Sequence, residues 1–449
     1  MSIEYANINL RKQILSLAWP AILEMVLHTA VWIFDTAMVG RLNAEALSAV
    51  GFGSQLASTL TFVFSAIGIG TSAVVARNIG EENQKKAEHV VAQAFLVSLI
   101  IGISIALINF IYGGAIFLMF MDDPVVIALG TDYIKIVSIG IIFTVPTLVM
   151  NSALRGAGNT KLPMFSAFIA NTINIVGDYV LIFGKLGFPS LGVNGAAIAT
   201  TVSQIFGAII TIGYMVGSSS EVRLKLKGLL DIDITIIKQI VNISIPACLE
   251  ELSHSGSKLL TSMWLVRLGT VPFAAHQVAV SAESMSFMPG YGFSVAASSL
   301  VGRNLGAGKE RLAEISGWKS TKYSAILMSL VGVFFFMFPN WIISFFTNIT
   351  DVQELAVKCI IISAFEQPAI AVLTTLAGAL RGAGDTKGPF YIRAAVIWLI
   401  RMPLIFTVVF ILKKNVTSVW LVIVIQFYIE AILMTIRYKK GQWKEIELN

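Results

Sequence analysis

About twelve long apolar runs follow one another along the 449-residue chain, and this pattern restricts its fold more than any other feature. Each run is near or above the roughly 20 residues with which a helix crosses a hydrocarbon core about 30 Å thick. Apolar residues make up 56% of the chain and charged residues only 13%, which excludes an ordinary soluble protein. The sequence therefore predicts an all-α membrane protein. The expected spans are residues 13–39, 46–76, 89–119, 125–153, 162–184, 193–215, 237–266, 271–302, 318–346, 352–379, 388–412 and 416–437.

The positions of Lys and Arg predict the topology. With the N-terminus inside, most of them fall in inner loops and at inner helix ends, as the positive-inside rule requires. The first residues lack a short apolar stretch followed by a small-residue cleavage site, so we expect no removable signal peptide. The basic residues behind the net charge of +6 form no stripe with interleaved aromatics, which argues against nucleic acid as a partner. We expect a multi-pass protein of the plasma (inner) membrane with both termini in the cytoplasm.

One phrase occurs twice, as LRGAGNTK at residues 154–161 and as LRGAGDTK at residues 380–387. The offset is 381 − 155 = 226 residues, and it also relates Pro20 to Pro246, Glu24 to Glu250 and His28 to His254. Six spans per half make the halves parallel copies, with a central cleft between them. We predict two six-helix bundles, 1–216 and 236–449, joined by a cytoplasmic linker at 217–235. The phrase is interpreted as an inner turn whose glycines permit a tight backbone and whose Arg and Lys hold it at the cytoplasmic surface.

This pattern and three motifs resemble the MATE (multidrug and toxic compound extrusion) transporters. The motifs are VGRNLGAG at 301–308, AAHQVA at 274–279 and LRGAGDTK, and the likeness covers essentially the whole chain. The resemblance implies a secondary active antiporter that exports organic, often cationic and amphipathic, compounds in exchange for H⁺ and/or Na⁺. Alternating access by rocking of one half against the other is the expected mechanism.

A flippase for a lipid-linked glycan or another lipid is the alternative function. Such a protein would line its cleft with cations, whereas the charges expected at mid-membrane here are mainly acidic, which favours a cationic substrate. No nucleophile, metal or phosphate-loop motif indicates an enzyme. We expect no cofactor beyond the coupling ion and no metal site. A monomer is expected because the substrate path lies within one chain.

Ionisable residues inside membrane helices are costly, so each is a candidate functional residue. In the first span Glu24, His28 and Asp35 share one helical face, and the first two are candidates for a proton relay or for lining the cleft. Asp35 and Asp178, on the fifth span, are both expected roughly 8–9 Å below the outer boundary, so the two carboxyl groups can meet. Carboxyl groups removed from water hold protons more readily, which suits proton carriers.

The resemblance also assigns roles in the N-terminal half. Asp35, Asn174 and Asp178 match, position for position, the aspartate on helix one and the Asn-x-x-x-Asp pair on helix five of MATE proteins. A threonine on helix six belongs to the same set; Thr200 and Thr201 are both available, and Thr200 is preferred. These oxygen atoms suit a shared proton or a small cation such as Na⁺.

The C-terminal half carries different acids near mid-membrane, namely Glu250, Glu283 and Glu366. Glu250 and Glu366 correspond by resemblance to acids on helices seven and ten of sodium-coupled members. Glu283 has no place in that pattern. His254 is the repeat equivalent of His28, and the pair is a further candidate for a relay or for lining the cleft.

By resemblance, the seventh and eighth spans line part of the substrate cavity, as they do in MATE proteins. Soft side chains on these spans would suit varied amphipathic ligands; ordinary packing or lipid contact is the alternative. Lys258 and Arg401 are costly cations that we expect to pair with acids such as Glu366. The candidate lining residues are Met263, Met285, Phe287, Met288 and Tyr291.

Overall fold

The computed structural model describes residues 3–217, 220–229 and 231–446, and every regular element in these ranges is a helix, as predicted. Among the described residues, nine helices are long and apolar enough to cross a membrane. The count is ten if α13 (Thr350–Ala364) and α14 (Gln367–Gly382), which are bent by 54° relative to each other, form one span. Helix α8 (Ile234–Leu265) and the pair α9 (Thr270–Ser284) and α10 (Phe287–Gly306) occupy the other two expected spans. Helix α8 carries several charged residues, and the pair is interrupted. The chain is a multi-pass membrane protein.

The helices form two compact units. One unit consists of residues 23–244, and the other of the first 22 residues together with residues 245–449. The first unit holds most of α1 (Ile3–Val39) and the start of α8 (Ile234–Leu265). Its other helices are α2 (Ala44–Ser65), α3 (Ile67–Gly80), α4 (Gln84–Phe120), α5 (Pro124–Gly156), α6 (Lys161–Phe183) and α7 (Gly192–Val216).

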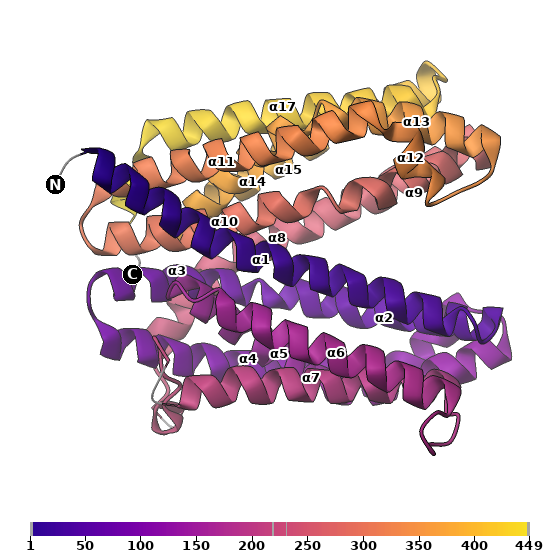
Figure 1. The fold of residues 1–449 in the computed structure, drawn as a ribbon, viewed down its shortest axis with the longest axis horizontal. Coiled ribbons are helices and arrows are strands. Elements are labelled where there is room, and N and C mark those ends of the chain that lie inside the picture. Colours follow the sequence, from indigo (N-terminus) through magenta and orange to yellow (C-terminus); the bar gives the residue numbers. More distant parts are fainter. Residues whose placement is uncertain (1–2, 218–219, 230, 447–449) are drawn as a thin grey trace. The chain divides into compact units, whose positions relative to one another are not determined.

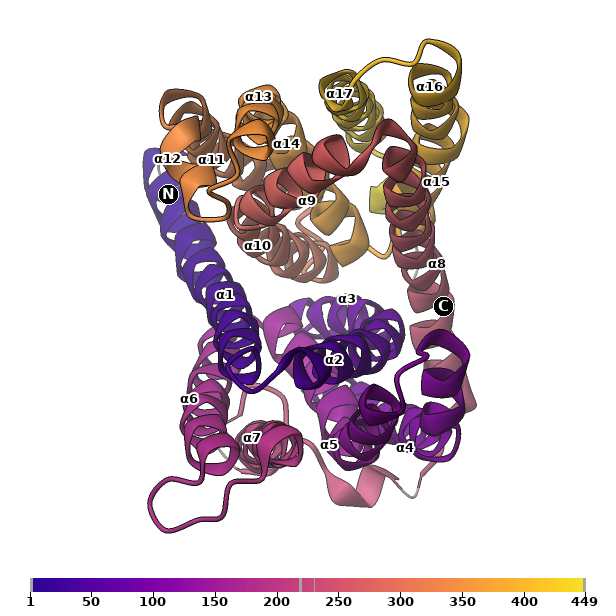
Figure 2. The same cartoon turned by 90° about the vertical axis from the view of Figure 1, so that its right-hand side faces the viewer.

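The helices of the first unit run alongside one another (Figure 1). Seen end-on, α4, α5, α7 and α6 form a row, and α2 and α3 lie against α5 (Figure 2). Helix α5 is therefore central, and its buried face includes Ile134, Ile141 and Val145. This arrangement places α1, α5, α6 and α7 around the polar residues described below.

The second unit repeats this design with more interruptions. A long stretch that the sequence predicts as one span, 388–412, contains α15, α16 and two π-helical segments, Ile397–Arg401 and Thr407–Ile411. The main hydrophobic core of the second unit lies between α10, α11, α14 and α17. The helices are α9 (Thr270–Ser284), α10 (Phe287–Gly306), α11 (Glu310–Met337), α12 (Pro339–Ser344), α13 (Thr350–Ala364), α14 (Gln367–Gly382), α15 (Lys387–Val396), α16 (Met402–Phe406) and α17 (Val416–Lys440).

Two helices cross from one unit to the other. The boundaries fall between Ile22 and Leu23 in α1 and between Ser244 and Ile245 in α8. The division by contacts cuts through α1 and α8, whereas the predicted bounds 1–216, 217–235 and 236–449 follow the sequence repeat and stay a prediction. Sequence order does not reveal which bundle the first turns of a helix pack against.

The apolar contacts explain this exchange. Leu10 and Ile14, in the first turns of α1, pack with Phe293 of α10. At the start of α8, the backbone of Ile240 approaches Gly70 of α3 so closely that a Cβ on Gly70 would lie 2.5 Å from the Ile240 carbonyl oxygen. Each unit therefore contains a segment from the sequence half of the other.

The repeated phrase ends α5 in one unit and α14 in the other, as the interpretation of a shared turn predicts. Gly158 and Gly384 both have φ +93°, a left-handed value that favours glycine. Gly156 and Gly382 serve a different purpose: a Cβ at these positions would lie 2.5 Å and 2.1 Å from the carbonyl oxygens of Ser72 and Ser298, respectively. The phrase thus combines a tight turn with close packing of two helices.

The two phrases differ at one residue, Asn159 in the first and Asp385 in the second, and each of these side chains has a partner of different charge. Asn159 donates from Nδ2 to both carboxylate oxygens of Glu221, each at 3.0 Å. Asp385 instead accepts from Arg437, whose Nε lies 2.8 Å from Oδ2 and whose Nη2 lies 3.1 Å from Oδ1. A donor faces an acid in one unit, and an acceptor faces a base in the other.

Candidate functional site

The structure brings Asp35 of α1 and Asp178 of α6 together. Their carboxyl groups lie close enough to interact directly. Asp178 is fully buried, whereas Asp35 is half-buried. The two side chains thus lie near each other, as their expected depths allow.

Asn174 and Thr200 extend this pair towards α7. Asn174 Nδ2 lies 3.4 Å from Thr200 Oγ1. Thr201 points elsewhere and donates to the carbonyl oxygen of Ile136 at 3.1 Å, so the preferred threonine is the one that lies beside Asn174. Gly177 allows the approach of the two helices, since a Cβ there would lie 3.0 Å from the Cβ of Ala199.

Several oxygen atoms of this cluster have no hydrogen-bond donor among the described residues. They are Asp178 Oδ1 and Oδ2, Asp35 Oδ1 and Asn174 Oδ1. Two ionised carboxylates in contact repel each other, and each buried acceptor without a donor is costly. A proton shared by the two aspartates, or a small cation bound by these oxygens, would remove both penalties. No group of three or more His, Cys, Asp and Glu side chains suited to a metal ion occurs in the described part of the chain.

Sequence reasoning missed Tyr133 of α5, which lies close enough to both aspartates to interact with their charge. Its hydroxyl lies 3.2 Å from Ser54 Oγ of α2. Gly53 makes room for the ring, because a Cβ there would lie 2.7 Å from Tyr133 Cδ1. A tyrosine in an apolar run is typical of ordinary packing. Its position beside the two aspartates is evident only from the three-dimensional structure.

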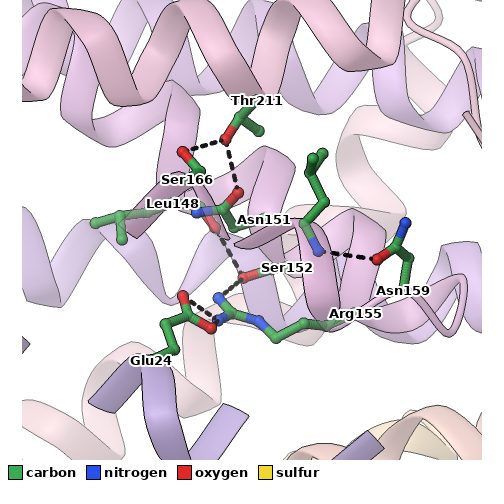
Figure 3. A network of polar contacts seen from close by, with 9 residues as sticks. Glu24, Leu148, Asn151, Ser152, Arg155, Asn159, Ser166 and Thr211 are labelled. Atoms are coloured by element: carbon green, nitrogen blue, oxygen red, sulfur yellow. Dashed lines mark hydrogen bonds and ion pairs between the residues drawn. The ribbon is translucent and has the colours of Figure 1, made fainter. Parts of the chain in front are cut away.

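Glu24 and His28 lie apart from this pair, on the side of the repeated phrase. Both carboxylate oxygens of Glu24 accept from Nη1 of Arg155, each at 2.9 Å, and both residues are buried (Figure 3). Arg155 also donates to Ser152 Oγ at 3.3 Å. This corrects the interpretation of Arg155 as a surface residue, because its guanidinium turns inwards to meet an acid. His28 is exposed and interacts electrostatically with Glu24 and Arg155.

In the second unit Glu250 is the counterpart of Glu24. It accepts from Arg381 at 2.7 Å and from Arg393 at 2.8 Å. Arg393 also lies 3.8 Å from Glu430, and Glu430 accepts from Gln426 at 2.8 Å. Arg393 and Glu430 were missed by sequence reasoning, because neither has a charged counterpart in the other half.

Glu283 and Glu366 contact each other and form a second acid pair. Both are buried, and both carboxylate oxygens of Glu366 lack a donor among the described residues. Glu283 lies in the last turn of α9, and Glu366 directly precedes α14, so both sit where a membrane-spanning stretch is broken. The partner of Glu366 is thus Glu283 rather than Glu250.

The remaining charged residues of this unit surround the second acid pair. Arg401, at the end of a π-helical segment, is buried and interacts electrostatically with Glu283 and Glu366. Lys258 is exposed and interacts with Glu283. Neither cation makes a direct ion pair with these acids within the described ranges. His254 is half-buried, and its Nδ1 has no hydrogen-bond partner there.

The candidate cavity residues differ in exposure. Met288 is buried, Phe287 is half-buried, and the others are exposed. Exposure on a membrane helix fits contact with lipid as well as with a substrate. The exposed residues are Met263, Met285 and Tyr291.

Comparison with known proteins identifies relatives over nearly the full length. The family model described as MatE matches residues 20–180 and again residues 246–407, shifted by 246 − 20 = 226, the offset of the repeat. The chain is 30% identical over 442 residues to "Probable multidrug resistance protein NorM" of Thermotoga maritima, covering 97% of this chain and 94% of that protein. It is 26% identical to "Multidrug resistance protein MdtK" of Yersinia pseudotuberculosis, with 95% of each chain covered.

Solved structures share the fold. A multidrug resistance MATE family transporter of the MOP superfamily, in an outward-facing conformation, superposes with a TM-score of 0.90 at 21% identity, covering 98% of this chain and 97% of that one. A MOP superfamily transporter from Pyrococcus furiosus gives 0.89 at 21% identity, with the same coverage. The shared architecture is the 6+6 arrangement of helices.

Proposed function

Because the chain belongs to the MatE family, whose members are transporters and not enzymes, we propose that it is a secondary active antiporter that exports organic compounds, chiefly cationic and amphipathic ones, in exchange for H⁺ and/or Na⁺. Relatives named as multidrug resistance proteins support a small-molecule substrate. The protein works as a monomer in the plasma (inner) membrane, with both termini in the cytoplasm.

The contact between Asp35 and Asp178 carries this proposal. A buried pair of acids whose oxygens lack donors needs a positive partner, and a proton or Na⁺ from the outer side supplies it. Asn174 and Thr200 contribute oxygens beside the pair. These four residues form the cation-coupling site, and Tyr133 lies next to it.

The same chemistry favours a cationic passenger over a glycan pyrophosphate. Anionic head groups require exposed arginines or lysines, whereas the charged group that interacts with Asp35 is another acid, Asp178. Loading of the pair with H⁺ or Na⁺ favours one arrangement of the two bundles, and binding of the organic cation favours the other. Ion loading and binding of the organic cation then alternate, so that one is exchanged for the other across the membrane.

Glu283 and Glu366 act as a second pair that takes up positive charge in the C-terminal bundle, with Arg401 nearby as a resident cation. Breaks in both helices at this point resemble the interrupted helices at which transporters bind ions. Glu250, in contrast, has its charge matched by two arginines.

Transport into vesicles with separately imposed proton and sodium gradients tests the proposal, with a fluorescent organic cation as the probe. Asp35→Asn should abolish exchange while leaving expression and thermal unfolding unchanged, because the amide cannot take up a cation's charge. Asp132→Asn is the matched control: Asp132 is exposed on α5, one residue before Tyr133, and its replacement should have no effect. Full exchange by Asp35→Asn under both gradients would refute the assignment of the site.

A further inference from the structure

The arginines of the repeated phrase each hold a glutamate on a helix that crosses between the units. Arg155 contacts Glu24 at 2.9 Å in one unit (Figure 3), and Arg381 contacts Glu250 at 2.7 Å in the other. Both members of the two pairs are related by the offset of 226 residues, since 24 + 226 = 250 and 155 + 226 = 381. The same buried contact thus occurs twice.

The position of each glutamate along its helix is informative. Helix α1 changes unit between Ile22 and Leu23, directly before Glu24. Helix α8 changes unit between Ser244 and Ile245, six residues before Glu250. In both cases the arginine belongs to the unit that the helix has just entered.

A proline accompanies each crossing. Pro20 lies inside α1 and Pro246 inside α8. A proline in a helix removes one backbone hydrogen bond and bends the helix easily at the preceding turn. Each crossing segment therefore combines a weak turn with a strong ion pair four residues further on.

We propose that Glu24–Arg155 and Glu250–Arg381 are two clamps that fasten the crossing helices to the unit they enter, so that bending during transport is confined to the proline turns. Arg155 and Arg381 are positioning residues. This inference rests on the proposed alternation between two arrangements of the bundles. It gives the repeated phrase a common role, since its arginine meets a buried glutamate once at each crossing.

The two clamps differ in strength. Within the described ranges, Arg155 provides the only ion pair to Glu24. Glu250 is shared by Arg381 and Arg393, at 2.7 Å and 2.8 Å. Loss of one arginine therefore opens the clamp on α1 but leaves the clamp on α8 with a second guanidinium.

The clamp on α1 is separate from the cation-coupling site. Glu24 precedes Asp35 by 11 residues, which corresponds to about 16 Å along a helix that rises 1.5 Å per residue. Opening the clamp should therefore disturb the movement of α1 without removing any oxygen from the site. A defect in rate with unchanged binding is the signature of this role.

The experiment compares Arg155→Gln with its repeat-related control Arg381→Gln in the full-length protein, reconstituted in vesicles. Arg155→Gln should slow transport of a fluorescent organic cation by about tenfold or more, because hinge variants change turnover. Equilibrium binding of the same compound should stay within about twofold, as expected for a site that keeps all its contacts. Hydrogen exchange in residues 23–34 should become faster. Arg381→Gln should change transport by less than about threefold, because Glu250 keeps Arg393.

Equal effects of the two variants, or a parallel loss of binding and transport in Arg155→Gln, would overturn the inference. If Arg155→Gln does not fold, Glu24→Gln/Arg155→Gln removes both charges and leaves none buried alone; wild-type transport by this double variant would also overturn it. Hydrogen exchange needs no transported compound. Suppose that the wild-type protein exports no organic cation while Arg155→Gln still shows faster hydrogen exchange at residues 23–34. That result would support the clamp and refute only the proposed function.

Discussion

Asn159 and Asp385 are the only residues that differ between the two phrases. Replacing each by the residue found in the other phrase should destabilise the unit in which it lies. Asp385 is 3% exposed and accepts three hydrogen bonds, two from Arg437 and one from the backbone N–H of Gly388 at 3.0 Å. Hydrogen bonds to charged groups contribute about 1.5–3 kcal/mol each. The Arg437 side chain is 34% exposed, so water replaces part of its lost interaction. We therefore expect Asp385→Asn to lower the free energy of unfolding by about 2 kcal/mol.

The reciprocal change, Asn159→Asp, places a carboxylate against that of Glu221. Two such charges about 4 Å apart repel by about 1 kcal/mol in water, and Glu221 is exposed. The loss should be about 1 kcal/mol and should shrink as salt is added. Since the two sites lie in different units, the double variant should show nearly the sum of the single effects.

Unfolding of the purified protein in detergent, followed by tryptophan fluorescence, measures these losses. Lys387→Gln is the control, because Lys387 belongs to the same phrase and is exposed; it should leave stability unchanged. If Asp385→Asn is as stable as the wild type, the explanation of the differing letter by charge complementarity is wrong.

Two further predictions use the same unfolding assay. Gly156→Ala and Gly382→Ala should each cost about 1–3 kcal/mol, since the new Cβ meets a carbonyl oxygen, whereas Gly51→Ala, with open space around its Cβ, should be neutral or gain about 1 kcal/mol; a neutral Gly382→Ala would contradict the close packing seen here. Glu366→Gln should preserve or raise stability, because its amide supplies a donor to Glu283, and a clear loss would show that the two acids are not joined through a proton.

The repeat offset predicted much of the architecture. Paired positions such as Glu24 and Glu250 indicated equivalent helices. The similar depths of Asp35 and Asp178 below the outer boundary predicted that these two side chains can meet. The direction in which an arginine turns was not predictable, because the positive-inside rule concerns where a residue lies along a helix and not which neighbour it contacts. Arg155 is therefore a buried partner of Glu24 rather than a surface anchor.

Other features depend on tertiary contacts alone. Arg393 and Glu430 balance each other's charge from α15 and α17, and their repeat equivalents, Ala167 and Gln204, are uncharged. A comparison of the two halves therefore draws no attention to them. The pairing of Glu283 with Glu366 likewise depends on helix breaks that an apolar run does not reveal.

The exchanged segment of α1 imposes an order on biosynthesis. The ribosome delivers Leu10 and Ile14 first, yet their packing partner Phe293 is made only after more than half of the chain. Until Phe293 has been made, the first turns of α1 contact lipid or another, temporary protein neighbour. The unit of residues 23–244 is complete in sequence before α10 is made, whereas the other unit can take up the first turns of α1 only after α10 has been synthesised.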